Sequence, residues 1–257
     1  MVDKKCYWCE KEAVSMEHVP PRCLFPEDKD VKHIFNKTYR EHLITVPSCD
    51  EHNLQKSNLD EYLMVTLSGK VGNNGLAYIQ TLTKIERSRK RNSKLLDIEK
   101  GETIYIKDKE FPVLWVNVDT QKLNYSFESI ARGLYYHENN TSFKGRITIV
   151  SKLFNHPDDS NGTEFNIRAS KLIESERMHW NTEVKGTNKE VFSYQFSPID
   201  GFKTQTLALN FFEGIDIYII LNELTDKDYE EAKLKLSFLN KAFLGDLQLN
   251  ANHRDKQ

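Results

Sequence analysis

Apolar side chains in the first 70 residues form two short runs and then a helical pattern. Residues 14–19 largely alternate apolar and polar side chains, which predicts a β-strand. Pro20-Pro21 follows and ends the strand, because proline has no N–H to continue a ladder. The β-branched run 42–46 predicts a second strand, and the polar stretch 26–41 predicts a loop. A helix is predicted after Cys49, where apolar residues recur with an imperfect helical period. These residues are Leu54, Leu59, Leu63, Val65 and Leu67.

The rest of the chain mixes helical and strand patterns. Three glycines near residue 72 mark a break, and a helix is then predicted over residues 76–88. Residues 127–135 carry apolar side chains at i, i+3, i+4, i+7 and i+8, which predicts an amphipathic helix. Turn-forming residues 156–162 predict a loop, and residues 229–243 predict a final helix. Strands are predicted at 103–106, 113–118, 145–150, 191–196, 206–212 and 215–221.

Composition limits the class of protein more than the function. The 257 residues are 39% apolar, which is enough for one large or two small domains. The net charge of −2 means that any binding of nucleic acid must come from local basic patches. Residues 1–6 have no apolar run behind them, so we expect neither a signal peptide nor a membrane span, and a cytoplasmic location. Four cysteines in such a chain favour metal binding over disulfides.

Two pairs of metal-binding residues share one spacing. Cys6 and Cys9 are separated by two residues, and so are Cys49 and His52. Two such pairs can supply four ligands to one tetrahedral Zn²⁺. The alternative, unrelated buried thiols and a surface histidine, is less favoured because both pairs fall within one short module. Cys23 lies outside the pattern and is interpreted as a core thiol.

A possible second metal site is suggested by Glu17-His18, which lies between the two pairs, and by Asn53, which directly follows His52. A structural zinc would bring these three residues near one point. His18 is suited to deprotonate water, because the ordinary pKa of histidine lies near neutrality. Glu17 and Asn53 offer oxygen atoms, which suit Mg²⁺ or Mn²⁺. Consecutive strand residues point to opposite faces, so Glu17 and His18 can act together only where the strand ends or bends.

Three stretches together resemble the HNH family of endonucleases, within the wider His-Me finger group. They are Cys6-x-x-Cys9, Glu17-His18-Val19-Pro20 and Cys49-x-x-His52-Asn53-x-x-Lys56. The resemblance covers residues 1–70. The sequence departs from the family pattern in having His52 for the usual last cysteine, Asn53 where a histidine is common, and no counterpart of the middle Asn.

The resemblance implies a ββα-metal module of treble-clef type with a structural zinc. It implies His18 as the general base, Glu17 and Asn53 as ligands of a catalytic Mg²⁺ or Mn²⁺, and Lys56 as a phosphate contact. Asp60, two helical turns after Asn53, is expected to lie behind these ligands. For Asn53 a helix-capping role is an equal alternative, and Lys56 is equally well explained as a solvated helix residue.

A basic run at the end of the predicted 76–88 helix is a second candidate for contact with nucleic acid. Arg89, Lys90 and Arg91 lie in it and could follow a phosphate backbone. An equally good explanation is that these cations complement the helix dipole.

These observations predict an α+β protein with a zinc module at 1–70 and a mixed α/β region at 71–257 that binds a partner, substrate or regulator. The expected function is metal-dependent hydrolysis of DNA phosphodiester bonds in bacterial or phage defence, with RNA as an open alternative substrate. The competing hypothesis is a non-catalytic zinc module that binds nucleic acid or protein. The enzyme needs Glu17-His18, whereas the binding module needs only the zinc ligands.

Overall fold

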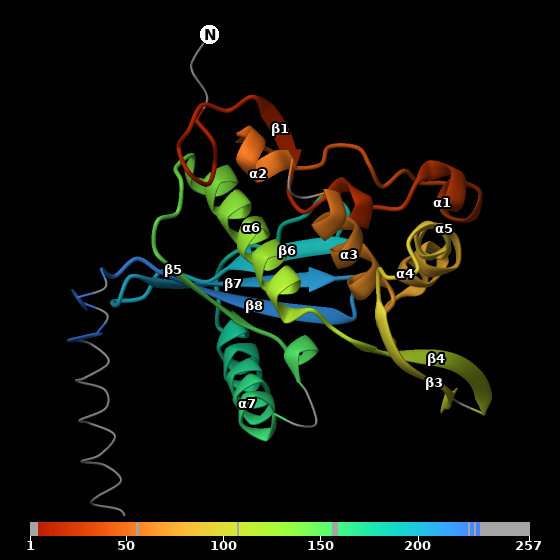
Figure 1. Cartoon of the computed structure of the whole chain (residues 1–257). Coiled ribbons are helices and arrows are strands. Elements are labelled where there is room, and N and C mark those ends of the chain that lie inside the picture. Colours follow the sequence, from red (N-terminus) through yellow and green to blue (C-terminus); the bar gives the residue numbers. More distant parts are fainter. Residues whose placement is uncertain are drawn as a thin grey trace, which may run out of the picture.

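The computed structural model describes residues 5–54, 57–106, 108–155, 159–225, 227–228 and 230–231. This part of the chain is a mixed α+β protein with antiparallel sheets, as predicted (Figure 1). The strands are β1 (Ser15–His18), β2 (Thr45–Ser48), β3 (Asp97–Ile106), β4 (Lys109–Asn117), β5 (Arg146–Val150), β6 (Phe192–Phe196), β7 (Thr204–Phe211) and β8 (Ile215–Asn222). The α-helices are α1 (Asp28–Phe35), α2 (Asp50–Leu54), α3 (Ser57–Ser68), α4 (Gly75–Gln80), α5 (Glu86–Arg91), α6 (Thr120–Asn139) and α7 (Ser160–Arg177). Shorter turns of helix are η1 (Arg22–Leu24), the π-helix η2 (Thr81–Ile85) and η3 (Lys152–Phe154).

The largest sheet has the strand order β5-β8-β7-β6, and every pair in it is antiparallel. Strand β7 shows how its two faces are covered. Leu207 and Leu209 belong to the main core that includes α6, whereas Ala208 between them packs with Ile173 of α7. Because successive strand residues point to opposite faces, α6 and α7 cover opposite sides of the sheet.

Helix α6 joins the sheet to the N-terminal module. Its apolar face is fully or almost fully buried and consists of Leu123, Phe127, Ile130 and Leu134. This is the helical periodicity that predicted the helix. Asp119 caps its start by accepting a hydrogen bond from the Lys122 N–H.

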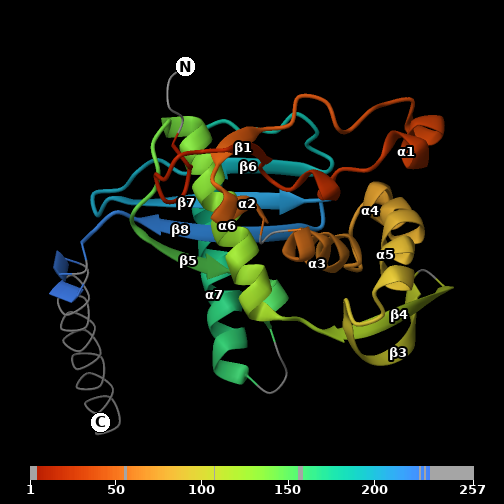
Figure 2. The ribbon, with the colours of Figure 1, turned by 45° about the horizontal axis from the view of Figure 1, so that its top comes forward.

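The N-terminal module has the predicted order of strand, strand and helix, and a turn that carries Cys6 and Cys9 precedes the first strand. Strands β1 and β2 pair antiparallel, with Ser15 opposite Ser48 and His18 opposite Thr45. The second strand begins three residues later than predicted. Helices α2 and α3 follow it, and α3 packs against α6 (Figure 2).

Two loop predictions were wrong. Residues 28–35 form α1, which buries only Val31 and is therefore hard to detect by apolar periodicity. Residues 160–162 begin α7, whose buried residues include the polar Asn166 and Ser170. Here the turn-forming residues have a capping role, because Asp159 accepts a hydrogen bond from the Gly162 N–H. Residues 156–158 and most of the predicted helix 229–243 lie outside the described residues.

One buried cluster runs through the described chain and includes Tyr7, Leu63, Leu76, Phe127 and Phe211. It contains residues from both sides of position 70, and the division into domains at that position stays a prediction. In the part of the chain that the structure describes, every helix is too short or too polar to cross a membrane.

Candidate metal centre and adjoining pocket

Four side chains from two separate segments meet beside the paired strands β1 and β2. Cys6 and Cys9 lie on the turn before β1, and Cys49 and His52 lie at the start of α2. Their ligand atoms all lie within 4.8 Å of one another. Cys49 Sγ lies 3.2 Å and Cys6 Sγ 3.7 Å from His52 Nδ1, and the sulfurs of Cys9 and Cys49 are 3.6 Å apart.

These distances fit one tetrahedral metal ion. Zn–S bonds of about 2.3 Å and Zn–N bonds of about 2.0 Å place two sulfurs about 3.8 Å apart, and a sulfur and a nitrogen about 3.5 Å apart. The ligand types, three thiols and an imidazole, also suit zinc better than harder cations. The predicted set of ligands is thus brought together, and it can hold a zinc ion.

The thiols differ in how readily they lose their protons. Burial raises the pKa of Cys6, but hydrogen bonds from the backbone N–H groups of Cys9 and Trp8 leave it below its ordinary value. Burial raises the pKa of Cys9 to about 11, against a smaller opposing effect of the Lys11 backbone. Zinc binds thiolates, so its binding must displace the Cys9 proton.

Trp8 supports the metal ligands from the outside. Its ring stacks on the imidazole of His52 with centroids 4.8 Å apart and an interplanar angle of 19°. On α6, Tyr125 stacks on Trp8 at 5.3 Å, and the Arg132 guanidinium lies 5.1 Å from the ring centroid. The orientation of His52 is therefore linked to α6 through one aromatic side chain.

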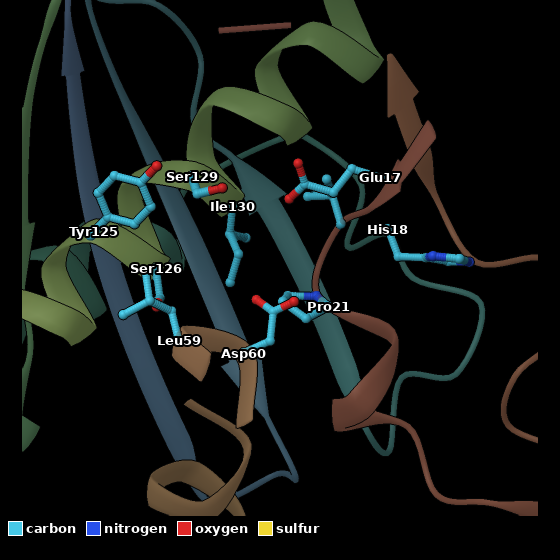
Figure 3. A pocket seen from close by; sticks show the side chains of 10 residues that line it. Glu17, His18, Pro21, Leu59, Asp60, Tyr125, Ser126, Ser129 and Ile130 are labelled. Atoms are coloured by element: carbon cyan, nitrogen blue, oxygen red, sulfur yellow. The ribbon is translucent and has the colours of Figure 1, made fainter. Parts of the chain in front are cut away.

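A small pocket lies where β1, α3 and α6 meet (Figure 3). Its volume is about 10 Å³, which is room for about one water-sized ligand. Glu17 is 8% exposed and its carboxylate points into the space beside Ser129, whereas the imidazole of His18 points away from it (Figure 3). Strand residues that follow one another diverge in this way. The lining residues are Glu17, His18, Val19, Pro21, Leu59, Asp60, Tyr125, Ser126, Ser129 and Ile130.

The electrostatics of the pocket favour a neutral imidazole. Burial lowers the pKa of His18, and the positive charge of Arg22 lowers it further. At neutral pH the ring can therefore accept a proton. Burial also raises the pKa of Tyr125, and the carboxylates of Glu17 and Glu128 add to this effect.

The other predicted residues lie at varying distances from the pocket. Asp60 lines it. Asn53 is not among the lining residues, and its Nδ2 donates a hydrogen bond of 2.7 Å to Ser15 Oγ. Ser15 precedes Glu17 by two positions on β1, so Asn53 and Glu17 lie on the same side of that strand. Lys56 lies outside the described residues.

The predicted basic run forms α5, and most of its cations have acidic neighbours. Lys90 pairs with Glu86 at 3.4 Å, and Arg91 pairs with Glu61 at 2.8 Å. Arg89 makes no ion pair with any residue that the structure describes. A contact of these three residues with nucleic acid stays a prediction.

Sequence reasoning missed the wall of the pocket that α6 provides. Tyr125, Ser126 and Ser129 occupy the helix beside the apolar positions that predicted it. The hydroxyl groups of Ser129 and Tyr7 lie 2.8 Å apart, and this contact joins α6 to the turn that carries Cys6 and Cys9. A tyrosine and two serines spaced along one helix are too common to identify a site without the fold.

Comparison of the chain with protein-family models, with curated proteins and with solved structures finds no match.

Proposed function

We propose that the protein is a metal-dependent nuclease whose N-terminal module is of the HNH, ββα-metal type. One observation carries the proposal. Two carboxylates, Glu17 and Asp60, line one pocket beside a group of four side chains suited to zinc, and His18, which follows Glu17, lies at its edge with the imidazole directed outward. A zinc-binding module used only for recognition has no need for this arrangement.

His18 is the proposed general base. Hydrolysis of a phosphodiester requires a water to be deprotonated as it attacks phosphorus. The lowered pKa keeps the imidazole neutral and able to accept that proton. His18 is half-buried and ends β1, so rotation about its side-chain torsions can bring the ring toward a substrate at the mouth of the pocket.

The oxygen atoms on the other side of β1 suit a hard divalent cation. Glu17 and Asp60 offer carboxylates, and the amide oxygen of Asn53 is available because its nitrogen is used to bond Ser15. When bound, Mg²⁺ or Mn²⁺ would supply positive charge that neutralises the phosphate and the leaving oxygen. The chain's own contribution is to fix these oxygens. The four zinc-binding side chains fix them from one side, and α6 fixes them from the other.

A cleavage assay tests the proposal. Zinc-loaded protein is incubated with supercoiled plasmid and, separately, with single-stranded RNA, in Mg²⁺ or Mn²⁺. We expect plasmid nicking. In Glu17→Gln and Asn53→Ala the metal concentration needed for half the maximal rate should rise, because these side chains act through the ion. Glu51→Gln is the matched control, since Glu51 is an exposed carboxylate of the same module that pairs with Lys11.

A folded, zinc-loaded protein that binds nucleic acid but cuts neither substrate in either metal would contradict the proposal. That result would favour the competing hypothesis of a zinc module for binding alone. Neither outcome tests a role in bacterial or phage defence, which stays a prediction.

A further inference from the structure

The β3–β4 hairpin is a ribbon that stands apart from the core. Its register runs from Asp97 opposite Asn117 to Ile106 opposite Lys109. None of its described side chains is buried. The ribbon projects from one side of the molecule beyond α5 (Figures 1 and 2). A two-stranded ribbon is only marginally stable alone in water. We therefore expect another surface to cover a ribbon that is as exposed as this one.

One face of the ribbon is apolar at its centre. Cross-strand partners share a face, so Ile104 with Phe111 and Val113 with Glu102 lie on the same side. Trp115 belongs to this face as well, since its Nε1 donates a hydrogen bond of 2.7 Å to Glu102 Oε2. Trp115 is 51% exposed and Phe111 36% exposed. These aromatic side chains have the character of interface anchors.

The charge of the ribbon argues against nucleic acid as the occupant of this face. A two-stranded ribbon has the right shape for a major groove, but residues 97–117 contain five carboxylates and only three lysines. Phosphates would be repelled by this excess of negative charge. On the face itself Lys100 and Lys109 lie with Glu102, and such mixed charges suit a protein surface better than a phosphate backbone.

The order of the charges along the face matches a second copy of the same face. Each pair of cross-strand partners on this face forms one row. From the base of the ribbon toward its turn, the successive rows carry Lys100, Glu102, the Ile104–Phe111 pair and Lys109. Asp108 occupies the turn. If a two-fold axis passes through the Phe111 row, Glu102 of one copy faces Lys109 of the other, and Lys100 faces Asp108. Such self-complementarity is what an isologous contact requires.

We propose that two copies of this chain associate through their β3–β4 ribbons, packed face to face about a two-fold axis near Phe111. Four rows spaced about 6.8 Å apart, on two strands about 4.8 Å apart, give a footprint on the order of 200–300 Å² per copy. A standard interface buries about 800 Å² per partner, so this contact alone supports only a weak dimer, with a dissociation constant on the order of 0.1–1 mM.

Sedimentation equilibrium on the full chain tests this proposal. The wild type should show a concentration-dependent monomer–dimer equilibrium, and Phe111→Ser should weaken it by about tenfold or more. Phe202→Ser is the matched control, because Phe202 is an exposed aromatic residue in the turn between β6 and β7. It should leave the dissociation constant within about twofold of the wild type. None of the substituted residues is buried, so zinc content and circular dichroism should stay unchanged.

Charge reversal gives the decisive comparison. Glu102→Lys and Lys109→Glu should each weaken the dimer, and the double variant should recover part of the loss, because each copy then supplies the same pair with its signs exchanged. The recovery is partial because Glu102 also pairs with Lys100 of its own copy at 3.7 Å. A wild type that stays monomeric at about 1 mM would overturn the proposal. So would a dimer that is insensitive to the ribbon variants, or a double variant no stronger than the singles.

Discussion

Replacing Gly133 with alanine tests how tightly α6 packs against the end of β1. Gly133 faces Val19, the residue that follows His18, and Val19 is 2% exposed. A Cβ at position 133 would lie 2.6 Å from Val19 Cγ2, 3.0 Å from Cγ1 and 3.3 Å from Cβ. Carbon atoms in good contact are about 3.5–4.0 Å apart. Rotation of Val19 cannot relieve the overlap, because both methyl groups and Cβ are too close, so α6 or the strand end must move by about 1 Å.

The expected loss of stability is the difference between two opposing effects. Overpacking in a well-packed core destabilises by about 1–3 kcal/mol, and the size of this overlap places it in the upper part of that range. Alanine in place of glycine in a helix returns about 1 kcal/mol. The net effect is a destabilisation of about 1–2 kcal/mol, which lowers the melting temperature of a chain of this size by about 2–8 °C. A shift of about 1 Å beside His18 should also reduce cleavage by up to about 10²-fold.

Thermal unfolding and the cleavage rate are the two measurements. Gly75→Ala is the matched control, because Gly75 begins α4 and a Cβ there meets no atom within 4 Å. It should change stability by no more than about 0.5 kcal/mol. Val19→Ala removes both clashing methyl groups. In the double variant Gly133→Ala with Val19→Ala, the two effects should couple by more than about 0.5 kcal/mol.

The close packing would be refuted by a Gly133→Ala variant as stable as the wild type. Strict additivity of Gly133→Ala and Val19→Ala would refute it as well.

The remaining predictions concern the metal centre and α5. Cys49→Ala should lose the bound zinc and destabilise the N-terminal module, whereas Cys23→Ala should keep one zinc per chain. Metal analysis and circular dichroism distinguish the two variants, and a wild-type protein without zinc would contradict the site. Chelation of zinc should change the fluorescence of Trp8 by releasing the stacked His52 ring, and Trp8→Phe should lack that change. Arg89→Ala should flatten the salt dependence of DNA binding by about one phosphate contact, and more than Lys90→Ala or Arg91→Ala, because those two cations are already paired. Equal slopes for all variants and the wild type would remove α5 from the binding surface.

The zinc ligands could be predicted because their chemistry is local. The two members of each pair are separated by two residues, and a thiol or imidazole at that spacing has few other uses. The fold then only had to bring two pairs together. The same holds for β1 and α6, whose apolar periodicity follows directly from the faces they bury.

The pocket could not be predicted in full, because its wall depends on contacts distant in sequence. Tyr125 and Ser129 lie more than 100 residues after Glu17, and nothing in their own neighbourhood marks them. Helix α1 was missed for a related reason. It is held by contacts such as the 2.9 Å ion pair between Asp30 and Arg87, and ion pairs between distant segments leave no periodic pattern. The divergence of Glu17 and His18 is the reverse case, since the alternation of strand residues already implied it.

The rate of DNA cleavage by His18→Ala tests the central claim most directly. It should be measured under single-turnover conditions, on protein shown to hold zinc and to bind DNA as the wild type does. His33→Ala serves as the matched control, because His33 is an exposed histidine of the same module, on α1. The account predicts a loss of about 10²–10⁴-fold for His18→Ala and none for His33→Ala. Cleavage by His18→Ala at the wild-type rate would contradict the assignment of His18 as the base.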